Sequence, residues 1–194
     1  MDDRALVLAS TSPYRRELLE KLRLPFESAA PDCDETALPG ETPAALVERL
    51  AEAKARNVAK RLPHALVIGS DQVAALGERI LTKPHTHERA FEQLRACSGR
   101  DVIFHTGLSV VDSAGEAAST ERSEYRVRFR ELGDDEIDRY LRAEAPYDCA
   151  GSIRSEGYAV TLFESLSGDD PNALIGLPLI RLCALLRAHG IHLP

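Results

Sequence analysis

Hydrophobic residues along the chain gather in short continuous runs, and longer segments with helical periodicity separate these runs. The run at 65–69 contains no charged residue, which is typical of a strand that is buried on both faces of a sheet, and the run at 5–9 predicts another short buried strand. Other apolar segments bounded by turn residues predict further strands. The predicted strands are 5–9, 26–30, 65–69, 102–111, 125–129 and 158–163.

Helices are predicted where apolar residues recur three and four positions apart and a capping residue precedes them. Ser12 and Thr42 are each followed by a proline, a combination that favours the first turn of a helix. Thr86 is a third cap, and Gly99 is placed to end the helix that Thr86 begins. The predicted helices are 13–22, 43–62, the segment between Thr86 and Gly99, 134–143 and 178–188.

The order of these elements decides the fold class. Strands and helices alternate early, whereas the middle of the chain adds hairpins near Gly77 and at 113–115. We therefore predict an α/β fold with a mixed, twisted sheet flanked by helices. The 194 residues suffice for one domain, 1–194, which can have two lobes around a central cleft.

Composition and charge narrow the class of protein. The formal net charge of −7 argues against a non-specific nucleic-acid binder, but it allows a small anionic substrate in a locally basic pocket. The N-terminus lacks the layout of a signal peptide, and no apolar stretch is long enough to span a bilayer. Four widely spaced cysteines without a C-x-x-C pair indicate thiols in a reducing cytosol. A cytoplasmic protein without a membrane partner is expected.

Candidate chemistry begins at the first predicted strand-to-helix turn, with the sequence STSPYRR at 10–16. Backbone N–H groups at a helix N-terminus favour an anion, and the forked guanidinium groups of Arg15 and Arg16 match phosphate oxygens. The alternative is an ordinary helix cap with two solvated arginines. The glycine-rich pattern of a P-loop is not present here.

Asp71 is the second candidate, since it comes just after the apolar run at 65–69, with only Ser70 between them. Ligands of open α/β sheets bind at the carboxyl ends of strands, where a carboxylate can hold a metal or orient water. Lys54, Lys83 and Glu35 are weaker candidates. A single lysine in either setting is more often a solvated side chain, and Glu35 is either a loop carboxylate or one linked to a metal.

Taken together, these segments resemble the Maf family of nucleotide pyrophosphatases, in order and over essentially the whole chain. The matching motifs are ASTSPYRRELL at 9–19, CDET at 33–36, AKA at 53–55, IGSDQV at 68–73, KP at 83–84, SG at 98–99, HTGL at 105–108 and GLP at 176–178.

The resemblance implies an enzyme that hydrolyses a nucleoside triphosphate to its monophosphate and pyrophosphate. It makes Asp71 the proton acceptor, or a ligand of the metal that activates the water, and assigns Glu35 a part in organising metal or phosphate. It implies a divalent cation, Mg²⁺ or Mn²⁺, which would neutralise charge on the leaving group. A homodimer is a further expectation. The residues placed around the phosphates are Ser10, Arg15, Arg16, Lys54 and Lys83.

Three positions depart from the family branch that prefers dTTP and UTP, and instead resemble the branch that prefers 7-methyl-GTP. They are Tyr14, which replaces a usual tryptophan, Gln72 and Glu156. One carboxylate such as Glu156 can accept from both N1–H and the exocyclic amine of guanine, a contact worth about 1–3 kcal/mol. An aromatic ring such as Tyr14 gains roughly 1–2 kcal/mol over a cationic methylated base when desolvated.

Other functions stay open at this point. A dTTP or UTP pyrophosphatase is the first alternative. A regulatory nucleotide-binding protein, as suggested by the link between this family and septum formation, is the second. An RNA-binding module is disfavoured by the acidic balance and the lack of interleaved aromatic and basic residues.

Overall fold

The computed structural model describes residues 4–115 and 118–194. The strands are β1 (Ala5–Leu8), β2 (Glu27–Ser28), β3 (Ala65–Leu76), β4 (Arg79–Leu81), β5 (Asp101–Asp112), β6 (Ala118–Phe129) and β7 (Phe163–Gly168). The helices are α1 (Pro13–Glu20), α2 (Pro43–Ala59), α3 (His87–Cys97), α4 (Asp134–Glu144), α5 (Pro171–Ile175) and α6 (Leu179–Ala188), with 3₁₀ helices η1 (Ala150–Ser152) and η2 (Tyr158–Leu162).

The strands form a sheet in the order β2-β1-β3-β5-β6-β7, and β4 pairs with β3. Strand β1 is parallel to β2 and β3, whereas β4 is antiparallel to β3 and β7 is antiparallel to β6. The predicted α/β class with a mixed sheet is therefore confirmed. No helix within the described residues is both long and apolar enough to cross a membrane.

The chain divides into two compact units, and three long strands contribute to both. Unit 1 comprises residues 1–71, 106–123 and 170–194, and unit 2 comprises residues 72–105 and 124–169. Strand β3 belongs to unit 1 up to Asp71 and to unit 2 from there on. Strand β5 belongs to unit 2 before Thr106, and β6 belongs to unit 2 after Ser123.

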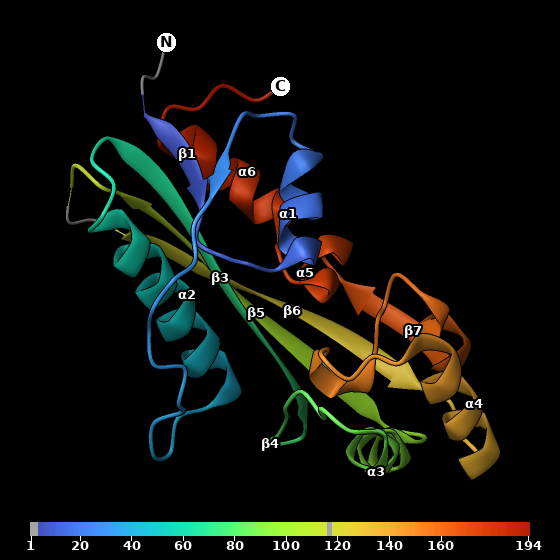
Figure 1. The fold of residues 1–194 in the computed structure, drawn as a ribbon. Helices are drawn as coiled ribbons and strands as arrows, with labels where there is room; N and C mark the ends of the chain where they lie inside the picture. Colours follow the sequence, from blue (N-terminus) through green and yellow to red (C-terminus); the bar gives the residue numbers. More distant parts are fainter. Residues whose placement is uncertain (1–3, 116–117) are drawn as a thin grey trace. The chain divides into compact units, whose positions relative to one another are not determined.

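Unit 1 packs helices against both faces of its strands (Figure 1). Leu6 and Leu8 of β1 lie in one apolar cluster with residues of α1 and α6. Val7 and Ala9 lie in a second cluster with Ala55 and Val58 of α2. Successive side chains of a strand point to opposite faces, so an uninterrupted apolar run is what a strand covered on both sides needs.

Unit 2 contains the antiparallel pairs β3–β4 and β6–β7 together with α3, α4 and the two 3₁₀ helices. A buried polar network ties its 149–157 segment to α3. The Ser152 hydroxyl, fully buried, donates to Gln93 Oε1 at 2.7 Å, and Gln93 Nε2 donates to the Thr82 carbonyl at 2.9 Å. Such a network is stable in the interior because each buried polar group has a partner.

The prediction of a strand at 158–163 is wrong. Residues 158–162 form η2, and the strand begins only at Phe163. The two buried residues of η2, Ala159 and Leu162, are three positions apart, which is the repeat of a 3₁₀ helix. The Thr161 hydroxyl also donates to the Tyr158 carbonyl at 2.9 Å, which stabilises the local turn. A run of apolar residues this short does not distinguish a strand from a helical turn.

Candidate active site

The strand-to-helix turn after β1 forms the first part of the site, in unit 1. The Ser12 hydroxyl caps α1 by accepting a hydrogen bond from the Arg15 N–H at 3.4 Å, and Pro13 occupies the first turn. Ser10 is buried, and its hydroxyl accepts from the Ser12 N–H at 3.1 Å. The first turn of α1 carries no acidic residue, so its partial positive charge is available to an anion.

Arg15 and Arg16 follow each other on α1 but face different surroundings. Arg15 is half-buried, and its Nε donates to the Gly176 carbonyl at 2.9 Å. Arg16 is exposed, pairs with Glu20 at 3.4 Å and stands 6.0 Å from the centre of the Phe26 ring. The structure therefore fixes the direction of the Arg15 guanidinium and leaves Arg16 in a solvent-screened pair.

A buried ion pair forms the second part of the site. Lys54 on α2 donates from Nζ to Asp71 Oδ1 at 2.6 Å, with side chains only 6% and 9% exposed. Glu35, which is 59% exposed, places Oε1 3.0 Å from the same nitrogen. One ammonium group thus holds two carboxylates together; the family resemblance places the three residues at one site, but no spacing in the sequence indicated this direct contact.

Two glycines allow α2 to come close enough for this contact. A Cβ atom at Gly69 of β3 would collide with the Ala51 carbonyl oxygen of α2, and one at Gly107 of β5 with the Val47 carbonyl oxygen. Neither glycine has a left-handed backbone, so both serve close approach rather than a turn. Both occur in sequence motifs, but the motifs alone gave no reason for them.

Electrostatics couple these two parts. Burial lowers the pKa of the Arg15 guanidinium from its ordinary value of 12.5, while the charges of Asp71 and Glu35 act to raise it. Arg15 stays protonated in any case, because arginine does not lose its proton in proteins. Burial raises the pKa of the nearby Cys33 thiol, and the Lys54 charge opposes that shift. The centre is therefore a mixed field of two cations and two carboxylates.

The remaining predicted site residues fall into both units. Tyr14 is half-buried in the first turn of α1, in unit 1. Gln72, Lys83 and Glu156 belong to unit 2. Gln72 lies in β3, and Lys83 is exposed just after β4. The structure itself brings together five of the predicted residues, around the carboxyl end of β1 and the middle of β3: Ser10, Arg15, Glu35, Lys54 and Asp71.

Glu156 is held by its own loop rather than being freely solvated. Its carboxylate lies 3.4 Å from Arg154 Nε and accepts from the Ser155 hydroxyl at 3.2 Å. Arg154 also lies 3.6 Å from Glu144, which in turn accepts from the Tyr158 N–H at 2.7 Å. A base that bound Glu156 would have to compete with Arg154 or share the carboxylate with it.

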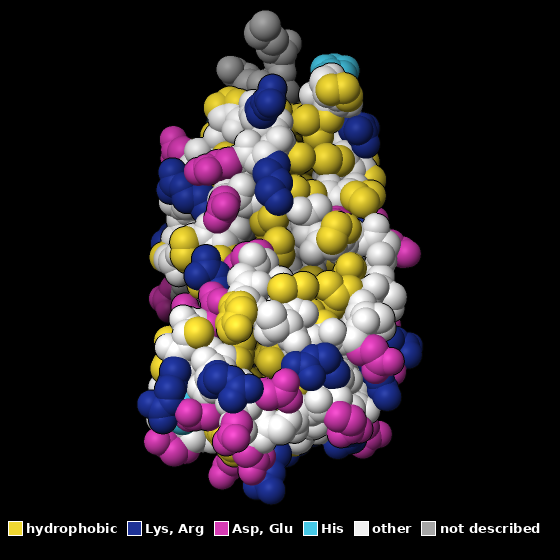
Figure 2. All heavy atoms as spheres, turned by 90° about the vertical axis from the view of Figure 1, so that its right-hand side faces the viewer, with side chains coloured by type: hydrophobic (Ala, Val, Ile, Leu, Met, Phe, Trp, Pro, Cys, Tyr) yellow, Lys and Arg dark blue, Asp and Glu magenta, His cyan; other side chains and the backbone are white. Residues whose placement is uncertain are grey.

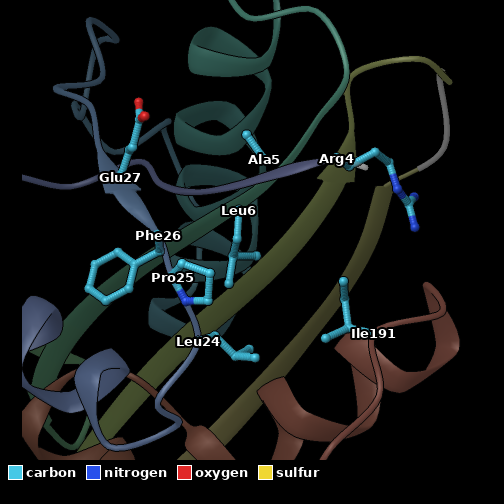
Figure 3. A pocket seen from close by; sticks show the side chains of 8 residues that line it. All are labelled: Arg4, Ala5, Leu6, Leu24, Pro25, Phe26, Glu27 and Ile191. Atoms are coloured by element: carbon cyan, nitrogen blue, oxygen red, sulfur yellow. The ribbon is translucent and has the colours of Figure 1, made fainter. Parts of the chain in front are cut away.

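A separate pocket of about 500 Å³ lies in unit 1 at the amino end of β1 (Figure 3). Its charged side chains, Arg4 and Glu27, point away from the apolar ones, and Arg4 is bound to Asp112 at 2.6 Å. Ser10 follows the carboxyl end of β1, and Asp71 lies within β3 just past the stretch that pairs with β1, so this pocket at the amino end of β1 is not part of the candidate site. It is lined by Arg4, Ala5, Leu6, Leu24, Pro25, Phe26, Glu27 and Ile191.

Basic and acidic side chains are interspersed on the face drawn in Figure 2, with hydrophobic ones between them. The described residues on that face form no continuous basic patch of the kind that tracks a nucleic-acid backbone. None of the four cysteines forms a disulfide in the described part of the chain.

Comparison with known proteins agrees with the motifs. Among relatives, a 7-methyl-GTP pyrophosphatase of Nitrosococcus oceani is 60% identical over 185 residues, which covers 95% of this chain and 93% of that protein. A relative of the same name from Polaromonas sp. is 60% identical, and the match covers 98% of this chain and 87% of that protein. Another from Aromatoleum aromaticum is 58% identical, and the match covers 97% of each protein. Residues 5–189 match the model of the Maf-like protein family. The chain therefore belongs to the Maf family.

Proposed function

We propose that this chain hydrolyses 7-methyl-GTP, with water, to 7-methyl-GMP and pyrophosphate. The observation that carries the proposal is the cluster of Arg15, Lys54 and Asp71 beside the N-terminus of α1 in unit 1. The names of the relatives at 54–60% identity, all 7-methyl-GTP pyrophosphatases, support the choice of nucleotide.

In this mechanism the basic groups hold the triphosphate and Asp71 acts on the water. The Arg15 guanidinium, the Lys54 ammonium and the Ser10 turn with the N-terminus of α1 bind phosphate oxygens, and Arg16 and Lys83 add positive charge. Asp71 Oδ1 accepts a hydrogen bond from Lys54 Nζ, whereas no group among the described residues donates to Asp71 Oδ2. That oxygen can accept the proton of the water that attacks the α-phosphorus, as the bond to the bridging oxygen of pyrophosphate breaks.

The residues present fit a divalent cation that binds together with the substrate. The described residues contain no cluster of three or more His, Cys, Asp or Glu side chains that could hold a metal ion. Asp71 and Glu35 nevertheless both pair with the Lys54 ammonium group, so their carboxylates lie close together. Mg²⁺ is commonly held by one or two carboxylates together with substrate phosphates and water. When bound, Mg²⁺ or Mn²⁺ would neutralise charge on the pyrophosphate leaving group.

Base recognition is assigned to Glu156, Tyr14 and Gln72. The Glu156 carboxylate would accept from N1–H and the exocyclic amine of guanine, and the Tyr14 ring would stack on the cationic methylated base. Gln72, next to the catalytic Asp71 in sequence, supplies an amide that can both donate and accept. A homodimer and a cytoplasmic location remain predictions.

The test is pyrophosphate release from 7-methyl-GTP, GTP, dTTP, UTP and CTP, each with Mg²⁺ and with EDTA. Selective, metal-dependent turnover of 7-methyl-GTP is expected. Activity confined to dTTP and UTP would retain the reaction but reject the base recognition. Binding of nucleotide without turnover of any of the five would favour the regulatory binding protein.

A further inference from the structure

The carbonyl oxygen of Gly176 is a shared acceptor at the candidate site. It accepts from Arg15 Nε at 2.9 Å and lies 2.9 Å from the hydroxyl of Ser70, the fully buried residue before Asp71. The same Ser70 hydroxyl lies 2.8 Å from the Gly107 carbonyl. One backbone oxygen thus connects Arg15 of α1 with the residue of β3 that precedes Asp71.

The backbone of Gly176 has a conformation that few other residues can adopt. Its φ is +124°, and an added Cβ would approach Arg15 Nε to 3.5 Å. Its N–H donates to the Asn172 carbonyl at 3.1 Å and ends α5. Glycine is the residue suited to such a φ, so the direction of this carbonyl is built into the chain at this position.

Asp170 anchors the segment that carries this carbonyl. It is 2% exposed, and its Oδ1 accepts from the Asn172 N–H at 2.9 Å and from Asn172 Nδ2 at 2.8 Å. Its Oδ2 accepts from the Ile180 N–H at 2.7 Å, at the start of α6. One buried carboxylate therefore joins the first turns of the two helices that flank Gly176. A buried charge is costly unless its oxygens are bonded in this way.

A further contact fixes the same segment from the strand side. The buried Thr106 hydroxyl of β5 donates to the Ala173 carbonyl of α5 at 2.8 Å. The segment that carries the Gly176 carbonyl is consequently held at α5, at α6 and at β5, and the carbonyl itself meets Arg15 and Ser70 of the candidate site. Among the described residues, no hydrogen bond from Nη1 or Nη2 of Arg15 is found, so both groups are available to donate to a bound anion.

We propose that Asp170 is a positioning residue for the reaction: by fixing the Gly176 carbonyl, it directs the Arg15 guanidinium so that its Nη groups meet the triphosphate. This inference rests on the proposed function, since it needs Arg15 to bind phosphate. Asp170 lies too deep to touch substrate and acts only through Gly176 and Arg15. The geometry of a bidentate phosphate contact depends on such support.

The experiment compares Asp170→Asn with Asp169→Asn, an exposed neighbour of the same charge. The Asn172 and Ile180 N–H groups are bound by different oxygens of Asp170, and asparagine replaces one of these oxygens by an NH₂ donor, so one of the two N–H groups loses its acceptor. We expect Asp170→Asn to lower kcat/KM for 7-methyl-GTP about tenfold, mainly through KM, and Asp169→Asn to match the parent chain.

A double-mutant cycle with Arg15→Lys separates positioning from a general structural effect. Lysine keeps the charge but lacks the fork that binds Gly176 and phosphate together. Arg15→Lys/Asp170→Asn should be within about twofold of Arg15→Lys alone, because Asp170 acts through Arg15. Independent losses that multiply would overturn the inference.

A measurement without substrate supplements the cycle. The Arg15 Nε–H signal in ¹⁵N NMR should exchange with solvent slowly in the parent chain and faster in Asp170→Asn; equal exchange rates would contradict the inference. If Asp170→Asn does not fold, Ser70→Ala takes its place, because it removes the second donor to the Gly176 carbonyl. Its loss of kcat/KM should then be absent in the Arg15→Lys background, and losses that multiply would contradict the inference. If Arg15→Lys turned over 7-methyl-GTP as well as the parent chain does, the proposed role of Arg15 in binding phosphate would be rejected instead.

Discussion

Two ion pairs in the molecule have opposite settings. The Lys54–Asp71 pair of unit 1 is 2.6 Å long with side chains 6% and 9% exposed, whereas the Arg154–Glu156 pair of unit 2 is 3.4 Å long with side chains 46% and 31% exposed. Removing one partner of a buried pair leaves a charge without compensation, while an exposed pair contributes little to stability. We infer that Asp71, to which we assign the reaction, is fixed before substrate arrives, and that Glu156, to which we assign base recognition, can exchange partners at low cost.

The largest expected effect is on the reaction itself. Asp71→Asn should keep the fold, because Lys54 retains Glu35 as a counter-charge, and should lower kcat for 7-methyl-GTP about 10³-fold by removing the proton acceptor. Steady-state pyrophosphate release measures this, with the exposed Asp148→Asn as the control. Turnover preserved in Asp71→Asn would remove Asp71 from the mechanism.

The next effect concerns the stability of the buried pair. Lys54→Met leaves the Asp71 carboxylate buried without its cation and should lower the free energy of unfolding by roughly 3 kcal/mol at neutral pH. Lys54→Met/Asp71→Asn has no lone buried charge and should recover most of that stability while staying inactive. Urea denaturation of the two variants checks this, and equal stabilities would mean that the pair is not isolated from water.

A smaller effect is expected at the exposed pair. Glu156→Gln should reduce the preference for 7-methyl-GTP over UTP roughly tenfold, because the amide replaces one of the two carboxylate oxygens by an NH₂ donor, which then faces a donor of guanine. Its stability should change little, in contrast to Lys54→Met. The matched control is Glu164→Gln, an exposed glutamate of β7 in the same unit. An unchanged substrate preference in Glu156→Gln would show that the guanine edge is recognised elsewhere.

The smallest effect lies at a third pair, between Glu41 and Arg49. Arg49 donates to both carboxylate oxygens, at 2.6 and 2.8 Å, and lowers the pKa of Glu41 from 4.5 to about 2. Since the folded-state pKa is depressed, the stabilisation is complete above pH 4.5 and is lost as the pH falls towards 2. The stability difference between the parent chain and Glu41→Gln should therefore shrink across that window in urea titrations. A difference that is independent of pH would argue against the pairing.

Much of the fold followed from hydrophobic runs and helix caps. The strand at 5–9 and the helices that begin at Pro13 and Pro43 were predicted because local sequence alone decides them. The first half of β6 was missed because its residues, from Ala118 onwards, are mostly polar and are ordered by pairing with distant strands. Helix α5 was missed because its five residues are stabilised by the Asp170 cap and a bond from Thr106, both outside the helix.

The candidate site shows the same division. Asp71, Lys54 and Glu35 could be singled out from the sequence, but their common contact depends on how closely α2 packs on β3. Gly176 appeared only as part of a motif, since a backbone carbonyl has no signature in the sequence. The roles assigned to Arg16, Lys83, Tyr14 and Gln72 stay predictions, which the proposed nucleotide panel and single substitutions can address.

The glycines at 69 and 107 have a consequence for how the protein tolerates mutation. A methyl group at either position would push α2 outward, and Lys54 would be carried away from Asp71 with it. A screen for folding and a screen for turnover would therefore reject the same substitutions at these two sites. In a mutational survey these two glycines would be classed with the hydrophobic core, although neither has a side chain. Their influence on the chemistry comes from the distance between α2 and the sheet, which sets the contact between Lys54 and Asp71.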